Sequence, residues 1–445
     1  MKRKIDTLFQ QWQSTPNHKP IVVKGCRQCG KTYSVMEFAK THYSQVVYLN
    51  FIQQPAYKSI FASSLRVDDI IEKLTSFLPA GTSLPISDTC IVFDEIQECP
   101  RARTALKFFQ MDGRFDVMCT GSLLGVSGYH SDEMNENDKF ADIPVGYEYI
   151  VNMYPLDFEE FLWANNIGDS TIAQIRKSLI EEKPIDNFWH QRLRELLLLY
   201  VVIGGMPEAI NCYFSTHNLS EVLAIQRGIV DGYRADMIKY SSREDQPRIK
   251  ACFNSIPAQL SKENKKFTYA QIKTGARAKD YWGSLQWIED AGIIRRCKNL
   301  HFPELPLEGN ANNDVFKIYM ADIGLLISQL EDGTQTAILQ GDLCGYKGAI
   351  FENLVADILG KMGRKLYYYH KESGLEIDFV MRYKGLCTLL ECKSTTGRAK
   401  SLQTILHNEN KYHVSQAIKV GDYNIGRKDS LLTLPLYLTF LLTDM

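Results

Sequence analysis

Eight residues near the amino terminus have the types and spacing of a phosphate-binding loop. The segment Gly25–Thr32 reads G-x-x-x-x-G-K-T, follows the apolar run Ile21–Val23 and opens a helical pattern over Tyr33–Lys40. Glycines let successive backbone N–H groups face one phosphate. Lys31 is predicted to bridge the β- and γ-phosphates of ATP, and the Thr32 hydroxyl to ligate Mg²⁺. The expected nucleotide contacts are Gly25, Cys26, Arg27, Gln28, Cys29, Gly30, Lys31, Thr32 and Tyr33.

A pair of acids at the end of an apolar run supplies the second half of this site. Cys90–Phe93 is followed by Asp94 and Glu95. In a Walker B strand the first acid holds Mg²⁺ through water, and the second orients or deprotonates the attacking water. A further run ends in Thr120-Gly-Ser122, where Ser122 is predicted to sense the γ-phosphate. The alternative for Ser122 is an ordinary strand-to-turn ending.

A second constellation of charged residues lies near the carboxyl terminus. Asp378 belongs to the run Glu376–Arg382, and Glu391 and Lys393 to the run Cys387–Lys393. Residues two apart on a strand share a face, so adjacent strands would bring Asp378, Glu391 and Lys393 together. Two carboxylates hold Mg²⁺ or Mn²⁺, and an ammonium stabilises developing charge, in metal-dependent phosphodiester hydrolysis. The alternative is a pair of strands joined by structural ion pairs.

The middle of the chain concentrates positive charge. Residues 239–300 carry thirteen Lys or Arg and six Asp or Glu, a net charge of +7. Their pattern resembles a winged-helix module, with a second helix near Asp280–Ala291 and a wing strand from Ile293. Such helices enter a DNA groove while basic side chains contact phosphates, for which Lys265 and Lys266 are candidates. The alternative is a protein-interaction module with a solvated basic face.

Composition bounds the class of protein that carries these motifs. The chain has 445 residues, 45% hydrophobic and 23% charged, which indicates about three globular domains and excludes a disordered chain. A net charge of −1 excludes a globally basic coat for nucleic acid, so any such site must be local. Eleven scattered Cys and no signal-peptide pattern predict reduced thiols in a cytoplasmic protein. The apolar runs Leu196–Met206 and Leu431–Leu442 are too short to span a membrane, and predict a buried helix and a buried strand.

The elements that must position these residues change type along the chain. Short apolar runs alternate with helical patterns over residues 20–125, which predicts an α/β fold with a parallel sheet. The runs are Pro20–Lys24, Val46–Phe51, Cys90–Phe93 and Val117–Thr120. We expect four parts: a P-loop ATPase core at 1–150, a helical extension at 151–240, a winged-helix module at 241–333 and an α/β domain at 334–445. The polar, acidic segment 127–145 is expected to be an exposed loop.

These motifs together resemble the prokaryotic AAA-superfamily ATPases with a carboxyl-terminal DUF4143 domain. The resemblance is intermittent, but it runs across nearly the whole chain, and its motifs are the P-loop with Arg27-Gln28, Asp94–Gln97, Thr120–Ser122, Tyr154–Phe161, Gly204–Glu208, Met320–Leu325 and Phe351-Glu352. It implies ATP and Mg²⁺ as cofactors. Asp378, Glu391-Cys-Lys393 and Glu352 on the preceding helix also resemble the core of PD-(D/E)xK nucleases, which implies a second metal site at Glu352, Asp378 and Glu391.

One position departs from the family pattern. Relatives often carry Gly-Arg before the Pro-Leu segment, and this chain has Gly146-Tyr147. The resemblance therefore gives no arginine finger, and Arg101, Arg103 and Arg234 are the candidates.

The leading hypothesis is an ATP-hydrolysing enzyme coupled to a DNA-binding winged helix and a nuclease-like domain. The alternative is a nucleotide-gated binding or scaffold protein, with an inert nuclease-like domain that holds DNA or a protein partner. A nucleotide kinase is disfavoured, because no second phosphate site with clustered arginines is present in the sequence.

Overall fold

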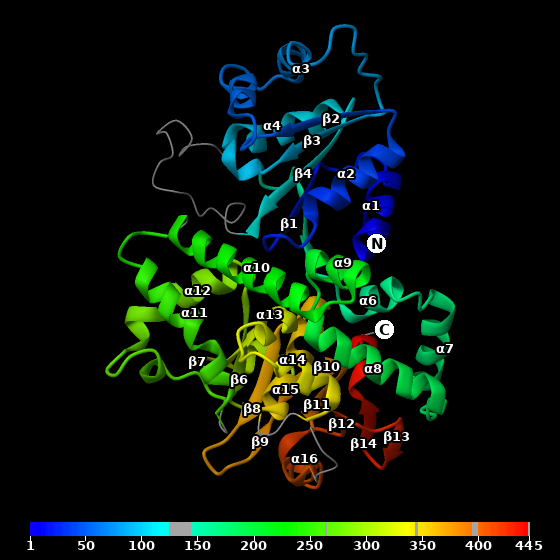
Figure 1. Cartoon of the computed structure of the whole chain (residues 1–445), viewed down its shortest axis with the longest axis vertical. Helices are drawn as coiled ribbons and strands as arrows, with labels where there is room; N and C mark the ends of the chain where they lie inside the picture. The colour runs from blue at the N-terminus through cyan, green and yellow to red at the C-terminus, as the bar shows by residue number, and fades with distance from the viewer. Residues whose placement is uncertain (124–143, 240, 263–264, 343–345, 394–398, 444–445) are drawn as a thin grey trace.

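The structure is a computed structural model that describes residues 1–123, 144–239, 241–262, 265–342, 346–393 and 399–443. The expected loop at 127–145 lies, but for its last two residues, outside this range. An amino-terminal α/β body forms one end of the molecule, the helices α8–α10 run across the middle, and two further sheets form the other end (Figure 1). The helix α9 lies between the first body and the rest (Figure 1).

The amino-terminal body is built on a five-stranded parallel sheet in the order β2-β3-β4-β1-β5. Its strands are β1 Ile21–Gly25, β2 Gln45–Asn50, β3 Thr89–Asp94, β4 Asp116–Ser122 and β5 Tyr149–Met153. The first four confirm the predicted runs and the α/β class. The edge strand β5 was not predicted, because its first residues are exposed and it lacks a long apolar run. The strand β4 lies between the strands that carry the P-loop and Asp94.

Alternating side chains of this sheet pack into two separate cores. One face is covered by α3 and α4 and the other by α1 and α2. These helices are α1 Lys4–Ser14, α2 Lys31–His42, α3 Val67–Thr75 and α4 Pro100–Asp112. On β3, Ile91 and Phe93 enter the first core, and Cys90 and Val92 the second. Because a parallel sheet is buried on both faces, its strands read as continuous apolar runs, which is why the sequence found them.

A mainly helical region follows and ends in a hairpin. Its helices are α6 Phe158–Ala164, α7 Asp169–Ile180, α8 Asn187–Ile203, α9 Pro207–Thr216, α10 Leu219–Lys239, α11 Gln246–Leu260 and α12 Ala278–Asp290. The strands β6 Ile294–Leu300 and β7 Ala311–Met320 pair antiparallel, and Lys266 forms a bridge with Lys317 of β7. The sequence predicted the helix and the strand on either side of Gly292, and both are present.

The carboxyl-terminal region contributes to two sheets. Their orders are β7-β6-β8-β9 and β10-β11-β12-β14-β13. The remaining elements are α13 Ile323–Ile327, α14 Thr334–Gln340, α15 Lys347–Lys361, β8 Leu366–His370, β9 Glu376–Ile377, β10 Phe379–Tyr383, β11 Leu386–Cys392, α16 Lys400–Leu406, α17 Glu409–Tyr412, β12 Gln416–Gly421, β13 Gly426–Lys428 and β14 Leu431–Pro435. Since β6 pairs with β8, the hairpin shares a sheet with the carboxyl-terminal region. One continuous core runs from Leu156 to Leu442.

Two apolar runs differ in outcome. Leu196–Met206 overlaps the buried part of α8, as predicted. The prediction of one strand over Leu431–Leu442 was wrong beyond Pro435, where a 3₁₀ helix, Leu436–Leu441, begins. Proline has no backbone N–H to donate to a strand ladder, so the strand ends there. Among the described residues, no single helix is long and apolar enough to cross a membrane; α8 and α9 pass such a test only as a pair bent by 117°.

Candidate nucleotide-binding site and carboxyl-terminal acidic cluster

The P-loop turns tightly between β1 and α2. A Cβ on Gly25 would lie 2.3 Å from the backbone oxygen of Met153 on β5, so only glycine fits there. Gly30 has φ of +98°, which favours glycine, and Gln28 also adopts a positive φ of 63°. The strand, loop and helix order that the motif requires is therefore present, and α2 begins at Lys31 with its free N–H groups at the loop.

Lys31 lies inside the loop. Its Nζ donates to the backbone oxygens of Cys26 at 2.8 Å and of Gly25 at 3.1 Å. The side chain is therefore held at the mouth of the loop, where an ammonium group meets phosphates of a bound nucleotide.

Asp94 joins the P-loop to the neighbouring strands. Thr32 Oγ1 donates to Asp94 Oδ1 at 2.9 Å, and Thr120 of β4 donates to the same oxygen. On the other side, Tyr48 Oη and Asn50 Nδ2 of β2 donate to Asp94 Oδ2 at 2.5 Å and 2.8 Å. Burial and Asp94 raise the pKa of Tyr48 to about 12. The hydroxyl and carboxylate that Mg²⁺ requires are thus in contact.

Sequence reasoning missed Tyr48 and Asn50. Their signal was present: two polar residues share a face at the carboxyl end of a strand, and Asn50 lies opposite Asp94 in the β2–β3 register. It named Ser122 at the end of β4, whereas the residue of that strand that contacts Asp94 is Thr120. Ser122 lines the cavity above the P-loop.

Glu95 follows Asp94 in a left-handed conformation, with φ of 55°. This conformation is rare for glutamate and turns the chain sharply after β3. Gln97 Nε2 donates to Glu95 Oε2 at 2.5 Å. Glu95 lines the same cavity as Lys31 and Thr32, so it faces the space where a terminal phosphate and a water would lie.

This cavity measures about 760 Å³ and is lined in part by segments far from the P-loop in the sequence. Pro207, Glu208 and Asn211 of α9 and Asp236 and Lys239 of α10 line it opposite the loop. Arg27 of the loop forms an ion pair with Asp236. The volume is in the range of sites for small molecules and cofactors.

Arg3 is a further lining residue that the sequence did not indicate. Its Nη1 donates to Cys29 O at 3.1 Å, its Nη2 to Tyr154 O at 2.7 Å and its Nε to Glu160 at 3.1 Å. Only the tertiary structure brings Arg3, the residue before α1, to the P-loop, so no local signal could have identified it.

The three arginine-finger candidates point elsewhere. Arg103 forms an ion pair with Glu148, Arg101 donates to Phe61 O, and Arg234 pairs with Asp231. None of the three lines the cavity, whose described arginines are Arg3 and Arg27.

The two P-loop cysteines are buried and free of disulfides. A hydrogen bond from Cys26, with the charges of Lys31 and Arg3, lowers the pKa of Cys29 to about 6. The two cysteines of the C-x-x-C motif are therefore buried structural parts of the P-loop.

Asp378 and Glu391, two of the predicted carboxyl-terminal site residues, lie at the break between the two sheets. Asp378 lies in the bend between β9 and β10, and the β10–β11 register places it opposite Glu391. Asp378 Oδ2 accepts from Cys392 N at 2.8 Å, and Lys393 Nζ lies 2.5 Å from Glu391 Oε1. Burial and the charges of Glu391 and Glu352 raise the pKa of Asp378. Glu391 Oε2 is buried without a hydrogen-bond partner.

Glu352 approaches the same place from α15 but is held by cations. Lys317 Nζ lies 3.0 Å from its Oε1, and Lys265 and Tyr319 also bind it. Burial raises the pKa of Glu352, but the charges of Lys317 and Lys265 outweigh it and lower this pKa to about 2. Lys265, expected to contact DNA phosphates, is thus committed to an internal acid. Across the described residues, no group of three or more His, Cys, Asp or Glu is arranged to hold a metal.

A second buried ion cluster lies at the far end of α15. Lys361 Nζ contacts Asp357 at 2.9 Å, Asp322 at 3.0 Å, Tyr200 Oη at 2.9 Å and Leu156 O at 3.2 Å. This amine is fully buried, and it joins the helical region to the carboxyl-terminal region.

Three models of protein domains match the chain. An AAA domain matches residues 17–162, a domain of unknown function, DUF8612, matches 194–336, and another, DUF4143, matches 347–438. No curated protein matches. Among solved structures, the chain is similar to the Walker-type ATPase PABY2304 of Pyrococcus abyssi, with 12% identity and a TM-score of 0.44 over 74% of this chain and 95% of that one. The chain therefore contains an AAA-type P-loop ATPase domain and a carboxyl-terminal DUF4143 domain.

Proposed function

We propose that the protein binds and hydrolyses ATP at the P-loop and couples this to a nucleic-acid module. The observation that carries the proposal is the convergence of Lys31, Thr32 and Asp94 at one end of the parallel sheet. The match to AAA domains supports it at the level of the domain.

The side chains divide the work of hydrolysis. The backbone of Gly25–Thr32 and Lys31 bind the phosphates, and Thr32 with Asp94 would hold Mg²⁺, which neutralises phosphate charge when bound. Glu95, oriented by Gln97, accepts a proton from the attacking water or aligns it. Thr120 and Ser122 on β4 lie between the two motifs and sense the terminal phosphate. Arg3 and Arg27 are the cations placed to stabilise negative charge in the cavity.

The output of this cycle is a winged-helix module followed by a nuclease-like domain. The order α11, Lys266 bridge, α12 and β6–β7 hairpin supports the winged helix, which binds DNA through the exposed start of α12. We divide the chain into parts 1–150, 151–240, 241–333 and 334–445, and place it in a reducing cytoplasm.

The acidic cluster supports a nuclease-like fold more than it supports cleavage. The orphaned Glu391 Oε2 beside Asp378 fits a divalent cation, and Lys393 lies next to it. A cation there would activate water for phosphodiester hydrolysis. Glu352 does not fit as a ligand, because Lys317 and Lys265 already neutralise it. The second candidate function, a nucleotide-gated scaffold with an inert domain, is favoured by these lysines.

A matrix of metals and nucleotides separates the two functions. The full-length protein is incubated with linear, nicked and single-stranded DNA, with Mg²⁺, Mn²⁺ or EDTA, and with or without ATP, while phosphate release and DNA cleavage are measured. We expect Mg²⁺-dependent phosphate release. Metal-dependent cleavage that Asp378→Ala abolishes would identify a nuclease, and its absence the scaffold; no phosphate release would contradict the proposal itself.

A further inference from the structure

A second cavity, of about 530 Å³, lies behind the P-loop, where three regions of the chain meet. Lys24 and Cys26 contribute to it from the ATPase domain, Arg295 and Lys298 from β6, and Lys365 from the position before β8. Six Lys or Arg and two acidic residues line it. The cavity is therefore a cationic cleft between domains, separate from the ATP site.

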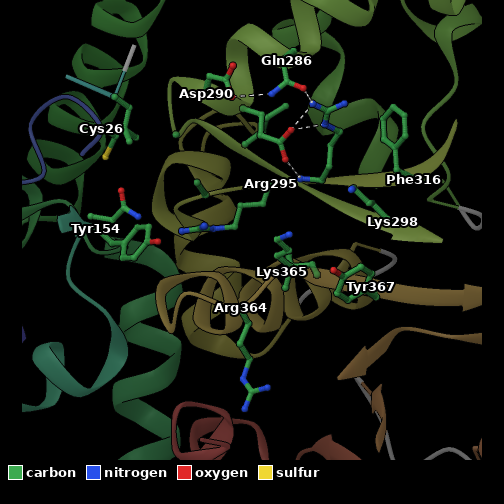
Figure 2. A pocket seen from close by; sticks show the side chains of 18 of the residues that line it. Cys26, Tyr154, Gln286, Asp290, Arg295, Lys298, Phe316, Arg364, Lys365 and Tyr367 are labelled. Atoms are coloured by element: carbon green, nitrogen blue, oxygen red, sulfur yellow. Dashed lines mark hydrogen bonds and ion pairs between the residues drawn. The ribbon is translucent and has the colours of Figure 1, made fainter. Parts of the chain in front are cut away.

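Aromatic side chains alternate with these cations. Figure 2 shows Tyr154 on one side and Phe316 and Tyr367 on the other, with Arg295, Lys298 and Lys365 between them. The guanidinium of Arg295 lies 5.0 Å from the centre of the Tyr154 ring, and its Nε is buried without a hydrogen-bond partner. Basic side chains that follow a backbone, together with rings on which bases stack, are how proteins bind single-stranded nucleic acid.

An internal carboxylate, Glu308, holds two of the cations that line the cleft. Glu308 accepts from Tyr367 Oη at 2.5 Å and from Lys365 Nζ at 2.8 Å, and lies 3.0 Å from Lys298 Nζ. These three donors lower the pKa of Glu308 to about 2. Two ammonium groups and a phenol hydroxyl thus surround one carboxylate. The same three donors could bind a phosphate in its place.

The dimensions favour one strand over a duplex. The C-terminal half of α12 contributes Gln286, Glu289 and Asp290 to the wall of the cleft, where all three are half-buried. At its end Gly292 packs so closely on the ATPase domain that a Cβ there would lie 2.4 Å from Leu123. A groove reader needs its helix free to enter a duplex, whereas nucleotide units of one strand fit this volume.

We propose that this cleft binds single-stranded nucleic acid, with Arg295, Lys298 and Lys365 on its phosphates, Tyr154 and Tyr367 stacked on its bases, and Glu308 as the resident competitor of one phosphate. The proposal rests on the nucleic-acid module of the proposed function, and it adds the strandedness and place of the ligand. The exposed start of α12 remains the proposed binding site for duplex DNA.

The test measures binding of a fluorescent oligothymidine of about 16 nucleotides, long enough for a typical single-strand site, by anisotropy without ATP over a series of salt concentrations. We expect Lys365→Glu to weaken binding about tenfold and to reduce the log–log salt slope by about 0.7, the contribution of one phosphate contact to a single strand. Glu308→Gln should tighten binding several-fold, because it releases both lysines. Lys428→Glu, an exposed reversal on β13, should change nothing.

Two further arms keep the outcome clear. Lys365 is exposed, so its variant should fold, and Arg295→Gln checks the inner end of the cleft. A duplex of the same length and thymidine monophosphate are compared with the strand. Binding that ignores Lys365 and Glu308, a duplex bound as tightly through the same residues, or the monophosphate bound as well as the strand would each overturn the proposal. Lys279→Glu, at the start of α12, should weaken only duplex binding, which reports on the winged helix separately, and ATP hydrolysis plays no part in this assay.

Discussion

The ATP site and the acidic cluster of the DUF4143 domain use charge in opposite ways. The P-loop presents backbone N–H groups, Lys31 and Thr32 around a cavity of about 760 Å³. In the acidic cluster, Lys265 and Lys317 hold Glu352, and Lys393 pairs with Glu391. At the first site Lys31 contacts backbone oxygens and lines an open cavity, although Arg3 and Arg27 are paired with acids. The second site satisfies most of its charges internally.

This difference in charge pairing predicts whether a variant at each site affects ligand binding or the stability of the fold. A positive loop at a helix start is stable alone and still binds anions. Buried acids are stable only when they are paired or protonated. Variants at the ATP site should therefore affect activity, whereas variants at the buried ion clusters of the carboxyl-terminal region should affect stability.

The largest expected effect is that of Lys31→Ala. Loss of the ammonium at the phosphates should reduce kcat/KM for ATP by at least about 10²–10³-fold, the usual effect of one well-placed charge stabiliser. Phosphate release and nucleotide binding measure it. Lys40→Ala, on the exposed face of the same helix, is the control, and an equal loss in both variants would show that α2 and not the ammonium matters.

The second-largest effect is expected for Glu95→Gln. An amide keeps the size of the side chain but accepts no proton, so hydrolysis should slow by about 10²–10⁴-fold, while ATP binding persists. Single-turnover hydrolysis and equilibrium binding are measured together, with Glu37→Gln on the surface of α2 as the control. Unchanged turnover would remove Glu95 from the reaction.

In the ion cluster of α15, Lys361→Met should act on folding instead. It leaves Asp322 and Asp357 buried without their cation, which typically costs about 3–5 kcal/mol. Urea unfolding measures the loss. Residual folded protein should bind ATP with normal affinity, and a variant as stable as wild type would contradict the importance of this amine.

The smallest effect is expected for Asp378→Asn in EDTA. The amide oxygen still accepts from Cys392 N, but the charge beside Glu391 is gone, so stability should stay equal or rise by up to about 1 kcal/mol. Because the pKa of Asp378 is raised, the folded protein binds this proton more tightly than the unfolded chain does. The resulting contribution to stability is full below the unfolded pKa, near 3.9, and is lost as pH rises through the folded pKa. The variant should therefore lose less stability than wild type between about pH 4 and neutral pH.

A destabilised Asp378→Asn protein would mean that the carboxylate has a cation partner in solution. Addition of Mn²⁺ sharpens this: stabilisation of wild type but not of the variant would identify a metal site there. No stabilisation of either protein would favour the scaffold function.

The sequence predicted much of the ATP site because its parts are local. Eight consecutive residues form the loop, and Asp94 follows a strand whose apolar run is continuous because helices cover both faces of the sheet. The strand with Glu391 was also predicted, but the single strand predicted over Glu376–Arg382 is broken by the bend at Asp378. It could not predict that Lys265 turns inward to Glu352, because a basic run has the same pattern whether it faces solvent or an acid 87 residues away.

By itself, the sequence determined most of the elements and the chemistry of each motif, because backbone hydrogen bonding, side-chain period and loop geometry depend on neighbours in the chain. Only the tertiary structure decided what each charge contacts. It placed Arg3 on the P-loop and brought residues of α9 and α10 to the lining of the cavity. It also paired Lys298 and Lys365 of the cleft with Glu308. The physical reason is that electrostatic and desolvation energies depend on distance and burial between residues far apart in the chain, which spacing alone does not specify.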